Sequence, residues 1–213
     1  MSRGMSQEII DYRESTGEQT LWTNSAFGGM PAWNISVRQK GNLTDPVYRG
    51  LSLGFPHPIS SVFISMLGFF ILLMVLDVNI WLSFAGAIAY GLTSYLFIVI
   101  GAGHNAKAMA MAYMAPVLAG ILLAYKGKYL WGSILTAFAM AFQVRTGHLQ
   151  ITYYLLLIVI CLVIAELISD IQEKKLGHFF KASGALVVAS IIGVTGCSAL
   201  WGVLELFEQR KRV

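Results

Sequence analysis

Long runs of apolar residues, separated by short polar stretches, make up most of the chain after residue 57. The runs 59–76 and 78–101 contain no charged residue, and each approaches or exceeds the ~20 residues that a helix needs to cross the hydrocarbon core of a bilayer. Buried helices of soluble proteins rarely reach this length without a charge. The pattern therefore predicts an all-α, polytopic helical membrane protein with about six transmembrane helices, at residues 59–76, 79–101, 106–124, 129–144, 149–168 and 182–204.

The first 57 residues follow a different pattern, because they are polar and contain no apolar run of membrane length. Residues 6–14 mix apolar and charged side chains in a way that predicts one short helix. From Gly17 onward the Gly, Asn and Pro residues favour loops, with a turn at residues 28–31. We therefore divide the chain into a loop region (1–57), a transmembrane helical domain (58–207) and a basic tail (208–213).

Composition agrees with this class, since the 213 residues are 56% hydrophobic and only 12% charged, about half the charged fraction of a soluble domain. The formal net charge of +4 arises after residue 57, because the first 57 residues carry equal numbers of basic and acidic side chains. No clustered basic face of the kind that binds nucleic acid is present, so no nucleic-acid partner is expected. Cys161 and Cys197 lie in apolar runs and show no metal-ligand spacing, so neither a metal nor another cofactor is expected.

The charges of the short connections predict an orientation. Such short connections force neighbouring helices to be antiparallel. Alternate connections then place Lys126, Lys128, Lys174, Lys175 and Lys181 on one face and Lys107 and Arg145 on the other. The lysine-rich face is expected to be cytoplasmic and residues 1–57 extracytoplasmic.

Two features do not fit this orientation. A sixth spanning helix leaves the basic residues 210–212 outside, and no apolar anchor precedes the exported region. We therefore expect a further membrane helix upstream of Met1 and interpret the chain as a fragment.

Two polar clusters, residues 103–107 and 145–150, lie at the ends of apolar runs, and the two runs between them place both clusters on the same face. His104 and Lys107 are three residues apart, as are Arg145 and His148, so each pair shares a helix face. A guanidinium, an ammonium and two imidazoles suit a phosphate or pyrophosphate ligand. The predicted binding residues are His104, Asn105, Lys107, Arg145, His148 and Gln150. The acidic residues of the loop region, Glu8, Asp11 and Glu14, are candidates for a general base.

A simpler interpretation remains open at these clusters. Lys and Arg at helix ends commonly extend toward lipid head groups without any further function, and His is ordinary at a membrane interface. The same reasoning applies to Glu166, which is expected at the cytoplasmic interface and paired toward Lys174 or Lys175.

Three separated motifs carry a family resemblance: LWTNSAFGGMP at residues 21–31, AGHNAKAMA at residues 102–110 and HLQITYY at residues 148–154. In this order they resemble the N-terminal part of bacterial YfhO-family membrane proteins, in the version found in Bacteroidetes-type bacteria. The resemblance runs from about residue 4 to residue 195. Members of this family are several times longer and open with a membrane helix, which agrees with the interpretation as a fragment. The end of the chain after residue 196 does not resemble the family, which agrees with it as well.

The YfhO family is similar to the GT-C class of glycosyltransferases, in which a long first external loop bears a catalytic acid and the sugar donor is a polyprenyl phosphate. The resemblance implies a bacterial cytoplasmic-membrane protein that transfers a sugar to a cell-envelope acceptor, with membrane lipid and a polyprenyl-phosphate-linked sugar as partners. Asp11 and Glu8 are the catalytic candidates by position, and the alternative position lies upstream of Met1. Two other functions remain open: a transporter or flippase of a lipid-linked substrate, and a non-catalytic subunit that binds envelope-assembly proteins.

Overall fold

The computed structural model describes residues 3–18, 20, 22–24, 28–32, 44–56 and 58–196, and the chain divides into two compact units, Met1–Gly41 and Asn42–Val213. The helix α2 (Thr44–Leu51) therefore belongs to the second unit, although it lies within the predicted loop region. The basic tail at 208–213 and the last part of the predicted segment 182–204 lie outside the described residues.

The first unit contains one helix and one short pair of strands. α1 (Arg3–Thr16) is followed by β1 (Trp22–Thr23), which pairs antiparallel with β2 (Met30–Pro31). Gly28 and Gly29 have positive φ angles of 74° and 121°, a conformation that favours glycine, and they form the turn that leads into β2. The short helix predicted at residues 6–14 is confirmed and is longer at both ends.

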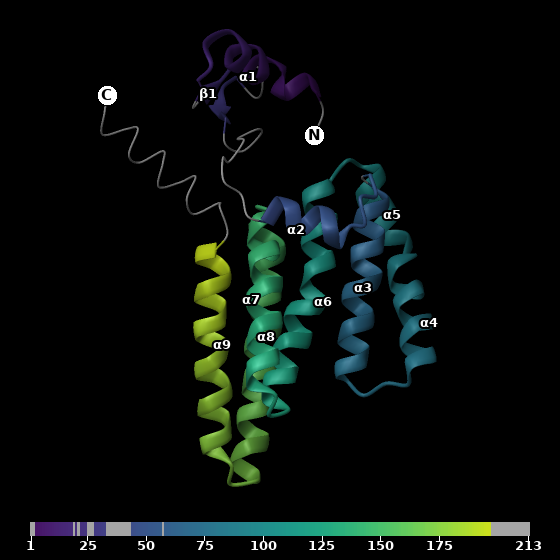
Figure 1. Cartoon of the computed structure of the whole chain (residues 1–213), viewed down its shortest axis with the longest axis vertical. Helices are drawn as coiled ribbons and strands as arrows, with labels where there is room; N and C mark the ends of the chain where they lie inside the picture. Colours follow the sequence, from purple (N-terminus) through teal and green to yellow (C-terminus); the bar gives the residue numbers. More distant parts are fainter. Residues whose placement is uncertain are drawn as a thin grey trace, which may run out of the picture. The chain divides into compact units, whose positions relative to one another are not determined.

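The second unit is a bundle of helices that run alternately up and down (Figure 1). After α2 its helices are α3 (Ile59–Val75), α4 (Ile80–Gly91), α5 (Ser94–Gly101), α6 (Asn105–Tyr125), α7 (Tyr129–Arg145), α8 (Leu149–Gln172) and α9 (Leu176–Gly196). The connections are short, as predicted, so successive helical segments are antiparallel, with α4 and α5 together forming one segment, Ile80–Gly101.

The connections use a common turn at the helix C-terminus. After α5 and α6 a glycine, Gly103 or Gly127, adopts a positive φ of 79° or 85°. The next amide then bonds back to the helix, from His104 to Val99 (3.0 Å) and from Lys128 to Leu123 (3.2 Å). Because this turn satisfies the last carbonyls and reverses the chain within a few residues, the following helix returns beside its predecessor.

The predicted segment 79–101 is divided into α4 and α5 by a break at Leu92 and Thr93. At the break both the backbone amide and the hydroxyl of Thr93 donate to the Tyr90 carbonyl, at 3.3 Å and 2.9 Å. A threonine that bonds to the backbone in this way competes with the regular helical hydrogen bonds, and this competition is not visible in the hydropathy pattern.

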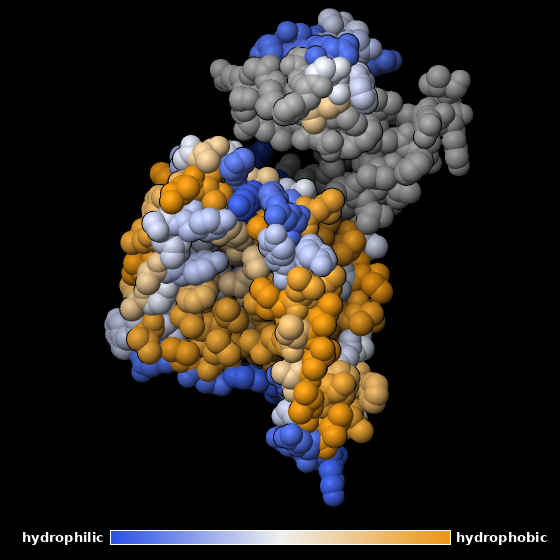
Figure 2. All heavy atoms as spheres, turned by 180° about the vertical axis from the view of Figure 1, so that it is seen from behind, coloured by the Kyte–Doolittle hydropathy of each residue, from blue (hydrophilic) through white to orange (hydrophobic). Residues whose placement is uncertain are grey.

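Of the described helices, four stretches are long and apolar enough to cross a membrane: Ile80–Gly101, Asn105–Tyr125, Leu149–Gln172 and Leu176–Gly196. Ile59–Val75 is apolar but shorter. On the face that Figure 2 shows, hydrophobic residues cover most of the helical unit and hydrophilic residues gather at its lower end. The described part of the chain is therefore helical with four candidate membrane spans, fewer than the six expected. The last begins at Leu176 rather than residue 182, directly after the turn that ends α8, and its first turns include His178 and Lys181.

The centre of the bundle is α6, which packs against α3 on one side and α7 on the other. Its small residues Ala108, Ala112, Ala115 and Ala119, which are spaced so that they permit close helix contact, are all buried. The two helices approach closely at Gly132 of α7, where an added Cβ would lie 2.5 Å from the Ala124 amide nitrogen. Small side chains therefore hold α6 and α7 in a fixed antiparallel register.

Candidate functional site

The two predicted polar clusters lie at the same end of the helical unit, where α6 begins and α7 ends (Figure 1). The rings of Tyr113 on α6 and Phe142 on α7 stack with centroids 5.2 Å apart, which places these two positions at one level. Lys107 precedes Tyr113 by six residues and Arg145 follows Phe142 by three. At 1.5 Å per residue, the two cationic positions lie within roughly 5 Å of one another along the bundle axis.

Arg145 lies over an aromatic ring supplied by α2. Its guanidinium carbon is 5.1 Å from the centroid of Tyr48, within the range of a cation–π contact. The Tyr48 hydroxyl donates to the Ser60 hydroxyl at the start of α3 (3.1 Å). The ring also packs against the cluster that contains Ile64 and Tyr113. Helix α2 thus orients the guanidinium at the end of the bundle.

Lys107 makes a similar contact with a different element. Its ammonium nitrogen lies 5.3 Å from the centroid of the Tyr95 ring on α5. The neighbouring Ala108 is fully buried against Leu96 and Val99, so the first turn of α6 is held against α5. The two cations therefore share an end of the unit but lie against different tyrosines, one on α5 and one on α2.

The remaining predicted residues occupy the two turns at this end. His104 is exposed at the N-terminus of α6, and Asn105 is half-buried beside it. His148 caps α8, because its Nδ1 accepts a hydrogen bond from the Ile151 amide (3.4 Å). Gln150 donates to the Tyr154 hydroxyl on the outside of α8 (2.8 Å). His148 and Gln150 thus have local structural partners.

Three polar side chains near Arg145 were not among the predicted binding residues. Besides Tyr48, these are Tyr113 and Gln143, which are 3% and 0% exposed. The Gln143 amide nitrogen donates to the Thr152 hydroxyl (3.3 Å), whereas its Oε1 and the Tyr113 hydroxyl are buried without a hydrogen-bond partner. Buried polar atoms without a partner among the described residues are costly and uncommon in folded proteins. In the sequence, the feature that points to this group of side chains is Gln143, a polar residue two positions before Arg145 in an apolar helix.

The candidate acids belong to the first unit. The Glu8 carboxylate accepts hydrogen bonds from the Thr23 hydroxyl (2.6 Å) and the Asn24 amide (3.2 Å), so it ties α1 to the strand that follows. Asp11 accepts a hydrogen bond from Gln7 one turn earlier on α1 (2.8 Å) and is exposed. Both residues are exposed on α1, and they differ in that Glu8 also bonds to the segment after the helix.

The interpretation of Glu166 requires a correction. The structure does not pair it with Lys174 or Lys175; Lys175 instead bonds to Glu173 (2.7 Å), and this contact raises the pKa of its ammonium. Glu166 lies within electrostatic range of Asp170 and His178, which are themselves joined by a 3.0 Å contact. This cluster lies at the end of the unit opposite to Arg145. Asp170 and His178 lie on two different helices, so their contact does not follow from the spacing of residues along one helix face.

Among the described residues no group of three His, Cys, Asp or Glu side chains is arranged to hold a metal ion. Comparison of the chain with protein-family models, with curated proteins and with solved structures gives no match.

Proposed function

We propose that this chain forms a membrane part of a GT-C-like glycosyltransferase that transfers a sugar from a polyprenyl-phosphate donor to a cell-envelope acceptor in the bacterial cytoplasmic membrane. In this proposal all six helical segments lie in the bilayer, with α3 and α7, each 17 residues long, crossing where the hydrocarbon is thinned. The observation that carries the proposal is the pair Lys107 and Arg145, two cations at one end of a bundle with membrane-length helices.

Both cations suit a phosphate. Arg145 offers a planar fork that bonds two phosphate oxygens, and Lys107 a point charge. A cation–π contact uses the face of the guanidinium, so the Tyr48 ring orients Arg145 without itself bonding to the in-plane N–H groups.

An apolar groove near Lys107 supports a lipid-linked ligand. It has a volume of about 390 Å³ and lies between the start of α3 and α5, with Val62 and Ile100 among its lining residues. These two side chains also pack against the buried cluster that contains Ala108, the neighbour of Lys107. A polyprenyl chain in this groove carries its phosphate toward the N-terminus of α6. In this proposal Asp11 or Glu8 acts as the general base for the acceptor hydroxyl.

The test compares binding of a polyprenyl phosphate with binding of the polyprenol of equal length, which lacks only the phosphate. We expect Lys107→Ala and Arg145→Ala each to weaken binding of the phosphate about 10- to 100-fold, the loss of a hydrogen bond to a charged group, and to leave polyprenol binding unchanged. Lys174→Ala at the opposite end is the matched control. Unchanged phosphate affinity in both variants would falsify the donor-site assignment.

A further inference from the structure

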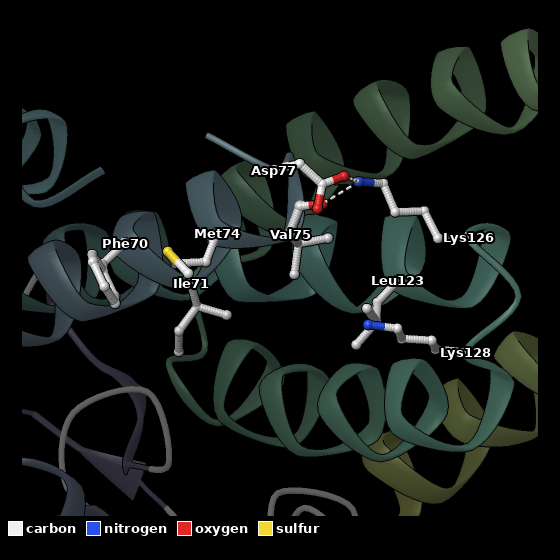
Figure 3. Close-up of a pocket in the computed structure, with 8 residues that line it drawn as sticks. All are labelled: Phe70, Ile71, Met74, Val75, Asp77, Leu123, Lys126 and Lys128. Carbon is white, nitrogen blue, oxygen red and sulfur yellow. Dashed lines mark hydrogen bonds and ion pairs between the residues drawn. The ribbon is translucent and has the colours of Figure 1, made fainter. Parts of the chain in front are cut away.

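The end of the helical unit opposite to Arg145 contains a second basic feature, built on a tertiary contact between two turns. Lys126, in the turn between α6 and α7, forms an ion pair with Asp77, in the turn between α3 and α4, and also donates to the Val75 carbonyl (Figure 3). The carbonyl belongs to the last turn of α3, where a helix end attracts a cation. This contact fixes the ends of α3 and α6 relative to one another.

Beside this contact lies a hollow of about 310 Å³ between α3 and α6. This volume is at the lower end of the range for pockets that hold small ligands. Its walls are apolar and are formed by Phe70, Ile71, Met74, Val75 and Leu123 (Figure 3). A long apolar chain is therefore the ligand type that such walls accommodate.

Charged groups border the same hollow. Asp77, Lys126 and Lys128 complete its lining, so two ammonium groups stand against one carboxylate. Lys126 already pairs with Asp77, whereas Lys128 is exposed and makes no hydrogen bond or ion pair with the described residues. The rim thus has a surplus positive charge, carried by Lys128, next to apolar walls.

We propose that this hollow binds one anionic phospholipid, with the phosphate at Lys128 and an acyl chain along the apolar wall of α3. Three observations combine here: the hollow lies at the end of α6, a helix of membrane length, its walls are apolar, and its rim is positive. A free anion leaves the apolar walls unfilled, and a zwitterionic lipid does not use the surplus charge. Each basic residue near an anionic lipid surface contributes about 1 kcal/mol, which corresponds to about fivefold in affinity. This site is independent of the proposed sugar-donor site.

A fluorescent reporter in the hollow tests the proposal. Phe70→Trp is introduced into the full chain in lipid nanodiscs of phosphatidylcholine, and the emission of the parent chain is subtracted. Brominated phosphatidylglycerol or brominated phosphatidylcholine is then added as a quencher. We expect phosphatidylglycerol to quench the added tryptophan with about fivefold higher apparent affinity. Equal quenching by the two lipids overturns the proposal.

Charge variants test whether the preference for phosphatidylglycerol over phosphatidylcholine depends on Lys128. Lys128→Gln should abolish it and Lys128→Arg should retain it, while Asp77→Asn should increase it by releasing Lys126. The matched control is Lys174→Gln, an exposed lysine at the same end in the α8–α9 turn, which should leave it unchanged. A preference that survives Lys128→Gln, or that is lost equally with Lys174→Gln, indicates diffuse surface attraction and contradicts the site. Competition by millimolar inorganic phosphate indicates a soluble-anion site and also contradicts it. Retained helicity by circular dichroism confirms that each variant is folded.

Discussion

The guanidinium carbon of Arg145 lies 5.1 Å from the centroid of the Tyr48 ring, so the last residue of α7 is oriented by a helix nearly a hundred positions earlier in the chain. This contact joins α2 to the bundle. Tyr48 also donates to the Ser60 hydroxyl, and a substitution can separate the contribution of the ring from that of the hydroxyl.

Tyr48→Leu removes the ring, and Tyr48→Phe removes only the hydroxyl. Because a cation–π contact contributes about 0.5–2 kcal/mol, we expect Tyr48→Leu to weaken polyprenyl-phosphate binding roughly 2- to 30-fold and Tyr48→Phe to change it less than about twofold. Titration of the purified variants measures both. Equal losses in the two variants contradict a role for the ring in orienting Arg145.

Gly132→Ala should destabilise the contact between α6 and α7. An added Cβ would lie 2.5 Å from the Ala124 amide nitrogen and 2.7 Å from the Gly120 carbonyl oxygen, both of which are backbone atoms that cannot rotate away. We expect the free energy of unfolding to fall by about 1–3 kcal/mol, measured by denaturant titration in detergent. Gly184→Ala in α9, where an added Cβ meets nothing within 4 Å, is the control and should be neutral or stabilising by up to about 1 kcal/mol.

The ion pair between Asp77 and Lys126 predicts a pH dependence. The hydrogen bond and the charge of Lys126 lower the pKa of the Asp77 carboxyl from its ordinary value of 3.8. A carboxyl with a lowered pKa stabilises the folded state above its ordinary pKa, and this contribution disappears as the pH falls through the lowered value. Asp77→Asn should therefore lower the Tm at about pH 6, and the effect should shrink as the pH falls below 3.8 toward about pH 2. A difference in Tm that is the same at both pH values contradicts this role of the carboxylate.

Lys174→Gly should stabilise the protein. Lys174 has a φ of 57° in the turn after α8, the conformation that Gly127 adopts after α6 with a φ of 85°. A residue with a Cβ is strained there by about 1 kcal/mol, so Lys174→Gly should raise the free energy of unfolding and Gly127→Ala should lower it by similar amounts. Denaturant titration of both variants checks the sign. A loss of stability in Lys174→Gly indicates that its side chain makes a contact worth more than the strain.

The helical segments are predictable from the sequence because long uncharged runs and short glycine turns act locally. The turns at Gly103 and Gly127 reverse the chain within a few residues, so the antiparallel order and the shared end of the two polar clusters followed from counting runs. The buried alanines of α6 were recognisable for the same reason, since residues four apart share a helix face. These features depend on spacing alone.

The partners of the polar side chains depend on contacts between distant segments. Hydropathy does not reveal that Tyr48 lies beneath Arg145 or that Asp170 contacts His178, because each pair meets only after the helices have packed. The break at Thr93 likewise depends on a side-chain hydrogen bond to the backbone. By itself the sequence determined an alternating, apolar, helical chain with both polar clusters at one end. Only the tertiary structure decided which aromatic rings lie beneath the two cations and which turns enclose the hollow at the opposite end, since close packing selects contacts that linear spacing does not encode.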